Sequence, residues 1–152
     1  MREALKEAKI AFDEGEIPIG AVVVLHDEII GRGRNSAIRF SDPTAHAEVM
    51  AIREAACGIG NYRLLGSILY VTIEPCIMCA GAIISARIKA LCYGAPDLRG
   101  GGVDSLYKVL GDVRLNHTVE VISGICESES VALLREFFHK RRDEKGEVPK
   151  WS

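Results

Sequence analysis

Two short segments, far apart in the chain, constrain the fold of this sequence more than any other feature. The first is His46-Ala47-Glu48, and the second is Glu74-Pro75-Cys76-Ile77-Met78-Cys79. One imidazole and two thiolates are a sufficient ligand set for a catalytic zinc ion, which takes three protein ligands and keeps its fourth tetrahedral position for water. The fold is therefore expected to bring His46, Cys76 and Cys79 to one point.

Glu48 stands two residues after the histidine and completes the predicted site. Zinc lowers the pKa of the water in its open position towards neutrality, so that hydroxide becomes available near pH 7. A carboxylate beside such a water can accept its proton and deliver it to a leaving group. The pattern predicts a hydrolytic site with one zinc ion per subunit and Glu48 as the catalytic proton carrier.

Two alternative roles for the cysteines stay open on the sequence alone. A structural zinc site is closed by a fourth cysteine or histidine, and the cysteines available for this are Cys57, Cys92 and Cys126, each among apolar neighbours. A thioredoxin-like redox pair also uses Cys-x-x-Cys, but it leaves His46 and Glu48 without a role. We favour the catalytic interpretation because it uses all four motif residues.

The length and composition are those of a single soluble, globular domain. The chain has 152 residues, of which 48% are hydrophobic and 26% charged, and this is enough to bury a core. It has neither an apolar run of membrane-spanning length nor a signal peptide. Five cysteines, two of them in Cys-x-x-Cys, suit a reducing compartment. We therefore expect a cytoplasmic protein with no membrane partner.

Hydrophobic periodicity and turn residues predict alternating helices and strands, hence an α/β fold. A single zinc-binding domain is expected over residues 1–145, followed by a flexible tail over residues 146–152. The last two strands are separated by a crossover with its own helix, in the apolar segment over 103–110, so we expect them to be parallel. The predicted helices cover residues 2–14, 42–58, 75–87 and 126–145, and the predicted strands cover 17–25, 28–34, 68–73, 88–93 and 119–122, with a loop over 35–44.

Both motif segments are expected at helix N-termini. Asp42-Pro43 is typical of a helix start, since Asp caps free amides and Pro has the φ of the first turn. Pro75 stands in the same relation to the cysteines. Residues two apart on a helix point in nearly opposite directions, so His46 and Glu48 can converge only in the first turn. We expect the metal at the edge of the sheet where strands end and helices begin.

At the level of motifs, the chain closely resembles the bacterial tRNA-specific adenosine deaminases, which convert the wobble adenosine of an anticodon to inosine. His-x-Glu followed by Pro-Cys-x-x-Cys is the signature of zinc-dependent nucleobase deaminases in general. The resemblance covers nearly the whole chain. The segments that carry it are Pro-Ile-Gly-Ala-Val-Val-Val at 18–24, Asp-Pro-Thr-Ala-His-Ala-Glu-Val-Met-Ala at 42–51, Asn-Tyr-Arg-Leu at 61–64, Leu-Tyr-Val-Thr-Ile-Glu-Pro-Cys-Ile-Met-Cys-Ala-Gly-Ala-Ile at 69–83 and Glu-Phe-Phe-His-Lys-Arg-Arg at 136–142.

The resemblance implies a single deaminase domain with a three-layer αβα cytidine-deaminase-like fold and a five-stranded mixed sheet. It also implies a homodimer, whose second subunit helps to build a surface for the tRNA anticodon loop. Under the same resemblance, His46, Cys76 and Cys79 match the zinc ligands and Glu48 matches the proton shuttle.

The resemblance further implies a set of substrate contacts. Asn35 matches a residue that reads the flipped base, Asp97 a loop position beside the neighbouring nucleotide, and Phe138 part of the helix that shapes the anticodon pocket. The amide of Ala47 stands where it could hold the base or its developing charge. By residue type alone, Asn35 is equally well a turn cap, and Asp97 an ordinary turn residue. The basic side chains of the last helix suit either phosphates or solvent; they are Arg135, His139, Arg141 and Arg142.

The predicted function is therefore zinc-dependent hydrolytic deamination of adenosine to inosine at the wobble position of a tRNA anticodon. One alternative is a deaminase of a free base or nucleoside, such as guanine or cytosine, with the same zinc chemistry. Another is an RNA-binding module with a structural zinc ion. The Asn61–Leu64 segment and the Phe137-Phe138 pair before a basic cluster favour RNA over a free base, and the presence of Glu48 argues against a module without catalysis.

Overall fold

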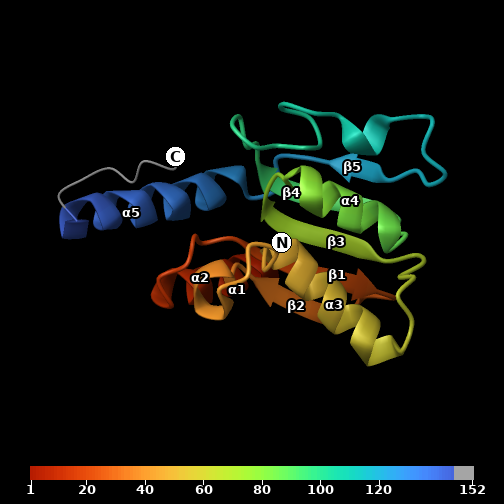
Figure 1. Ribbon diagram of the computed structural model, residues 1–152, viewed down its shortest axis with the longest axis horizontal. Helices are drawn as coiled ribbons and strands as arrows, with labels where there is room; N and C mark the ends of the chain where they lie inside the picture. The colour runs from red at the N-terminus through yellow and green to blue at the C-terminus, as the bar shows by residue number, and fades with distance from the viewer. Residues whose placement is uncertain (146–152) are drawn as a thin grey trace.

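The fold has three layers, with one five-stranded mixed sheet between two layers of helices, as expected (Figure 1). The computed structural model describes residues 1–145, so the predicted tail at 146–152 lies outside the described residues. The strand order is β2-β1-β3-β4-β5. The helices are α1 (Arg2–Asp13), α2 (Ala37–Phe40), α3 (Ala47–Ile59), α4 (Ile77–Ser85) and α5 (Glu127–Lys145), and the strands are β1 (Gly20–Leu25), β2 (Glu28–Arg34), β3 (Ile68–Ile73), β4 (Ala90–Ala95) and β5 (Glu120–Ile122).

The sheet changes direction between its first and second halves. Strands β1 and β2 form an antiparallel hairpin, and β1 also pairs antiparallel with β3. Strands β3, β4 and β5 are parallel, which confirms the predicted parallel arrangement of the last two strands. The crossover before β5 contains only a short 3-10 turn, η1 (Val109–Gly111), where we expected a helix.

The alternation of side chains along β1 assigns the helices to the two faces. Ala21 lies opposite Gly33 on one face, against α3, and Gly20 faces α1 on the other. Helix α4 contacts α3, and α5 contacts α1, so the two pairs form the outer layers. Figure 1 shows α3 and α4 side by side on one face and α5 extending beyond the end of the sheet.

The predicted helix start at Asp42-Pro43 is wrong, because α3 begins at Ala47. The carboxylate of Asp42 accepts hydrogen bonds from the backbone N–H and the hydroxyl of Thr44, at 2.8 Å and 2.7 Å. It therefore closes a local turn instead of capping a helix. This later start places His46 at the N-cap with an extended backbone, φ −77° and ψ 153°, and so removes the difficulty of two helical residues that point apart.

Smaller differences concern the ends of elements. Helix α4 begins at Ile77 with Cys76 as its N-cap, so Pro75 precedes the cap, and the helix ends at Ser85. The first strand begins at Gly20 instead of residue 17, β4 runs two residues later than expected, and the expected loop over 35–44 contains the short helix α2. The hairpin between β1 and β2 turns at His26-Asp27, and both residues have positive φ. No helix within the described residues is long and apolar enough to span a membrane.

The contact between β2 and α3 generates a prediction for stability. A Cβ at Gly33 would overlap the backbone of Ala47 and Ala51, whereas a Cβ at Gly81, inside α4, would meet nothing within 4 Å. Gly33→Ala is therefore expected to destabilise the fold by about 1–3 kcal/mol through overpacking. Gly81→Ala, the control, should stabilise it by about 0.5–1 kcal/mol through helix propensity. Urea unfolding of both variants measures this, and equal effects of the two substitutions would contradict it.

Candidate metal centre

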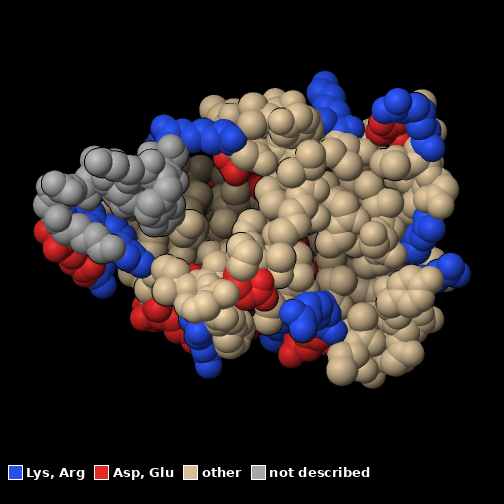
Figure 2. Space-filling model, in the orientation of Figure 1, with Lys and Arg blue, Asp and Glu red and all other residues tan. Residues whose placement is uncertain are grey.

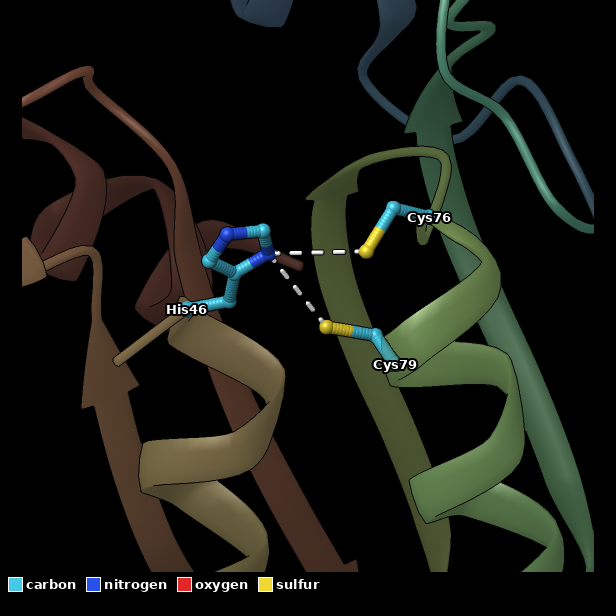
Figure 3. Close-up of side chains that lie close together, drawn as sticks. All are labelled: His46, Cys76 and Cys79. Carbon is cyan, nitrogen blue, oxygen red and sulfur yellow. Dashed lines mark hydrogen bonds between the residues drawn. The ribbon is translucent and has the colours of Figure 1, made fainter. Parts of the chain in front are cut away.

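The N-terminal ends of α3 and α4 present three metal-ligating side chains to one point. His46 is the N-cap of α3, Cys76 is the N-cap of α4, and Cys79 lies in the first turn of α4. Figure 3 shows the imidazole reaching from α3 towards both sulfur atoms on α4. The His46 Nδ1 atom lies 3.5 Å from Cys76 Sγ and 3.6 Å from Cys79 Sγ.

Among the described residues, these three form the one group whose ligand atoms all lie within 4.8 Å of one another. None of the cysteines considered as a fourth ligand belongs to it. Cys57 is exposed near the end of α3, Cys92 is buried in β4, and Cys126 precedes α5. Within residues 1–145 the structure therefore brings together three candidate ligands and no fourth, which fits an open metal site and not a closed four-ligand one.

The cluster favours the thiolate form that binds metals. A hydrogen bond from Cys79 and a second contact with His46 lower the pKa of Cys76 to about 4, against the opposing effect of burial. The same hydrogen bond, together with burial, raises the pKa of Cys79, and contact with Cys76 raises the pKa of His46. One thiol is thus ionised more readily than an isolated cysteine, and helix N-termini favour this negative charge.

Glu48 lies beside this cluster and is almost completely buried, with 4% of its surface exposed. Burial raises the pKa of its carboxyl to about 7, although its own backbone amide and His46 act in the opposite direction. An interaction with the Cys79 side chain also acts to lower this pKa. A carboxyl group that changes protonation near neutral pH is suited to carrying a proton during a reaction.

A cavity of about 140 Å³ lies between β2, α2 and α5. Asn35 and Phe138, two of the predicted substrate contacts, line it together with Glu16, Ile38 and Arg141. Figure 2 shows the surface hollowed beside α5, on the side where α3 and α4 begin. The structure therefore brings Asn35 and Phe138 to one cavity. Phe138 is partly exposed there, whereas its neighbour Phe137 is buried.

The other residues predicted to contact the substrate, Ala47 and the basic residues of α5, differ in their exposure and in the bonds that their side chains already make. Ala47 is fully buried as the first residue of α3. Arg135 and Arg142 lie on α5 with part of their surface open to solvent, and His139 bonds Asp143 one turn later at 2.9 Å. The Arg141 guanidinium donates to the carbonyl of Gly15 and stacks on the ring of Phe137, so it contributes to packing between α5 and α1.

The predicted residue Asp97 shapes its own loop. Its Oδ1 atom accepts the N–H groups of Arg99 and Gly100, at 3.0 Å and 3.1 Å. The other carboxylate oxygen, Oδ2, has no hydrogen bond among the described residues, and the residue is half-buried. The turn that residue type suggested for Asp97 is thus present, and Oδ2 stays available for a further donor.

Sequence reasoning missed Glu74, which lies at the end of β3, directly before Pro75 and Cys76. It is 3% exposed and accepts five hydrogen bonds from residues 97–105. Burial alone would raise the pKa of the Glu74 carboxyl group. The hydrogen bonds from Ser105, Asp104 and Asp97 lower this pKa by more, so the net shift is downward. A charged residue ending an apolar strand was the available signal.

Comparison with known proteins gives consistent matches. A family model described as MafB19-like deaminase matches residues 1–142. The tRNA-specific adenosine deaminase of Haemophilus influenzae is 53% identical over 146 residues, covering 95% of this chain and 84% of that protein. A solved structure from a study of A-to-I editing by tRNA:A34 deaminases at the wobble position has 47% identity and a TM-score of 0.85, covering 88% of this chain and 97% of that chain. A guanine deaminase from Nitrosomonas europaea, at 23% identity, TM-score 0.77 and coverage of 88% and 80%, shares the fold alone.

The geometry of the cluster predicts the residues on which metal affinity depends. Cys76→Ser should weaken binding of a divalent metal by more than about 100-fold, beyond the range for losing an outer partner of a ligand. Cys57→Ser removes an exposed thiol outside the cluster and should leave the affinity unchanged. Competition with a chelator of known affinity measures both variants, and equal losses would contradict the assignment.

Proposed function

The chain belongs to the family of the tRNA-specific adenosine deaminases, and we propose that it hydrolyses the wobble adenosine of a tRNA anticodon to inosine and ammonia. The observation that carries this proposal is the open cluster of His46, Cys76 and Cys79 with the buried carboxyl group of Glu48 beside it. Hydrolytic deamination needs an activated water and a group that moves its proton.

Zinc is the proposed metal, one ion per subunit. Two donors on one tetrahedral zinc ion, one nitrogen and one sulfur, are about 3.6 Å apart at ordinary bond lengths. The separations of His46 Nδ1 from the two sulfur atoms, 3.5 Å and 3.6 Å, fit this requirement. One imidazole with two thiolates is also a donor set that zinc prefers. When bound, the ion would supply a water whose pKa is lowered towards neutrality.

Glu48 performs the proton transfers in this mechanism. Its carboxylate accepts a proton from the attacking water and delivers it to a ring nitrogen of the adenine as the water oxygen bonds to C6. It then carries the second proton to the amine, which leaves as ammonia. Burial favours this role because a pKa near 7 lets the group both accept and release a proton. The N–H of Ala47, at the positive end of α3, would stabilise negative charge that develops on the base.

The cavity beside α5 is the proposed entry for the flipped nucleotide. Asn35 is 7% exposed and would form hydrogen bonds with the edge of the base from within the cavity. Phe138 would stack on the face of the base. Arg135, His139 and Arg142 would contact phosphates from the exposed side of α5. Arg141 is a weaker candidate for phosphate binding because its guanidinium already bonds Gly15. Asp97, through its second carboxylate oxygen, would contact the neighbouring nucleotide.

A homodimer is the proposed assembly, and a second copy would cover the outer face of α4. Figure 2 shows few charged residues over α4 and the C-terminal end of α3. Exposed apolar surface of this kind is characteristic of protein interfaces. The exposed apolar side chains on these elements and the adjoining loops are Ile59, Tyr62, Leu65, Ile77, Leu106 and Tyr107. The cytoplasm, where thiol ligands stay reduced, is the proposed location.

The free-base alternative is the weaker of the two enzymatic hypotheses. Its support is two guanine deaminase structures. The one from Nitrosomonas europaea shares the fold at 23% identity, and the one from Bacillus subtilis is 46% identical but covers only 62% of this chain, with a TM-score of 0.60. The relatives named tRNA-specific adenosine deaminase are 50% and 53% identical over 95% of this chain.

Replacing Glu48 separates an enzyme from a binding module. Glu48→Ala should lower the rate of inosine formation on an anticodon stem-loop at least about 10²-fold, the range for losing a general acid–base group, while the zinc content stays the same. Glu54→Ala, an exposed glutamate on the same helix, should keep full activity. The same assay should also offer free guanine, cytosine and adenosine as substrates. Ammonia from a free base, with the stem-loop untouched, would move the chain to the free-base alternative.

The arginines on the outer side of α5 should act through charge alone. The double variant Arg135→Ala/Arg142→Ala should weaken stem-loop binding and reduce the slope of log affinity against log salt by about one to two, one for each phosphate that is no longer bound. Arg114→Ala, an exposed arginine in the loop before β5, is the matched control. An unchanged salt slope in the double variant would remove these residues from the RNA surface.

A further inference from the structure

A single side chain holds both ends of the loop that adjoins the metal ligands. Glu74 Oε1 accepts the three consecutive backbone N–H groups of Val103, Asp104 and Ser105, at 3.2, 2.7 and 2.9 Å. Its Oε2 accepts the N–H of Asp97 at 3.0 Å and the hydroxyl of Ser105. Successive N–H groups that converge in this way form an anion-binding concavity, and here the anion is part of the chain.

The same loop is packed directly against the segment that carries the first cysteine ligand. The N–H of Gly102 donates to the carbonyl of Pro75 at 2.8 Å, and Gly101 forms a β-bridge with Cys76. A Cβ at Gly101 would overlap the Glu74 carboxylate, and one at Gly102 would lie 2.7 Å from the backbone nitrogen of Ile77. The glycine run 100–102 therefore lets the loop approach both Glu74 and the start of α4.

The strand end that carries Glu74 also fixes the metal centre. Glu74 follows β3 directly and precedes Cys76 by two residues, and its own N–H donates to the carbonyl of Ala95 at the end of β4 at 2.8 Å. One short segment thus connects the sheet, the metal ligand and the loop, so the distance from Asp97 to Cys76 depends on the Glu74 carboxylate.

We propose that Glu74 is a positioning residue, which fixes the 97–105 loop against the metal centre so that Asp97 meets the nucleotide next to the target base. This inference rests on the proposed function for the identity of the substrate. It assigns Glu74 no contact with RNA or with the reacting atoms. The two oxygens of a carboxylate accept all five donors, whereas a glutamine would turn an NH₂ group towards N–H donors that need an acceptor.

The test uses the zinc-loaded full chain and four variants, the last of which is described below. Glu74→Gln should speed amide hydrogen exchange at residues 97 and 103–105 by at least about tenfold, the effect of losing ~1.4 kcal/mol from hydrogen bonds to a charged acceptor. Ser105→Ala, which removes one donor, should have a smaller effect. Asp112→Asn, which alters an exposed aspartate bonded to Arg114, should change neither exchange in the loop nor catalysis.

Kinetics on the anticodon stem-loop distinguish positioning from a general loss of stability. Glu74→Gln should raise KM several-fold more than it lowers kcat, with the zinc content unchanged. Unchanged exchange at 97–105, or a KM equal to that of the parent despite a loosened loop, would overturn the proposal.

Gly101→Ala keeps the test valid if Glu74→Gln does not fold. It retains Glu74 and the metal ligands but forces the loop away from the carboxylate, so it should reproduce both effects, and its failure to do so would also overturn the proposal. If the parent protein leaves the stem-loop unreacted, the proposed function fails, while the exchange measurements still decide whether Glu74 holds the loop.

Discussion

The structure depends on the convergence of two helix N-termini at one edge of the sheet. His46 and Cys76 each end an extended segment and begin a helix, so their side chains point out of the helix ends towards each other. This requires α3 to lie very close to β2, which is possible because β2 has glycine where α3 crosses it. The same helix ends supply partial positive charge, which favours thiolate, carboxylate and a developing oxyanion in one place.

Burial and charge act against each other at this edge, and the balance differs between two glutamates. Glu48 has few donors, so burial raises its pKa to about 7 and it can exchange a proton. Glu74 has five donors, so its pKa is lowered although it is as deeply buried. One carboxyl group is thereby suited to chemistry and the other to a permanent structural role. Only the surroundings distinguish them, because the residue type is the same.

Residue spacing predicted the fold class and the convergence of His46, Cys76 and Cys79, because both depend on local rules. Cys-x-x-Cys after proline, and His-x-Glu before an apolar helix, each restrict the site whatever the rest of the chain does. The start of α3 was not predictable in this way. Asp42 has the residue type of a cap, and only the competing hydroxyl of Thr44 decides that it closes a turn. Glu74 was missed because its five donors come from a loop more than twenty residues later in the chain.

The attachment of α5 to α1 has a consequence for the cavity that Phe138 lines. The ring of Phe137 packs edge-on against Phe12 of α1, with centroids 5.6 Å apart, and Lys140 lies over the Phe12 ring. Arg141 bonds Gly15 at the end of the same helix. The cavity wall is therefore supported by the opening residues of the chain, none of which carries a motif. Substitutions between residues 12 and 15 would therefore alter the shape of the cavity through the packing of α5, at a distance from the cluster of His46, Cys76 and Cys79.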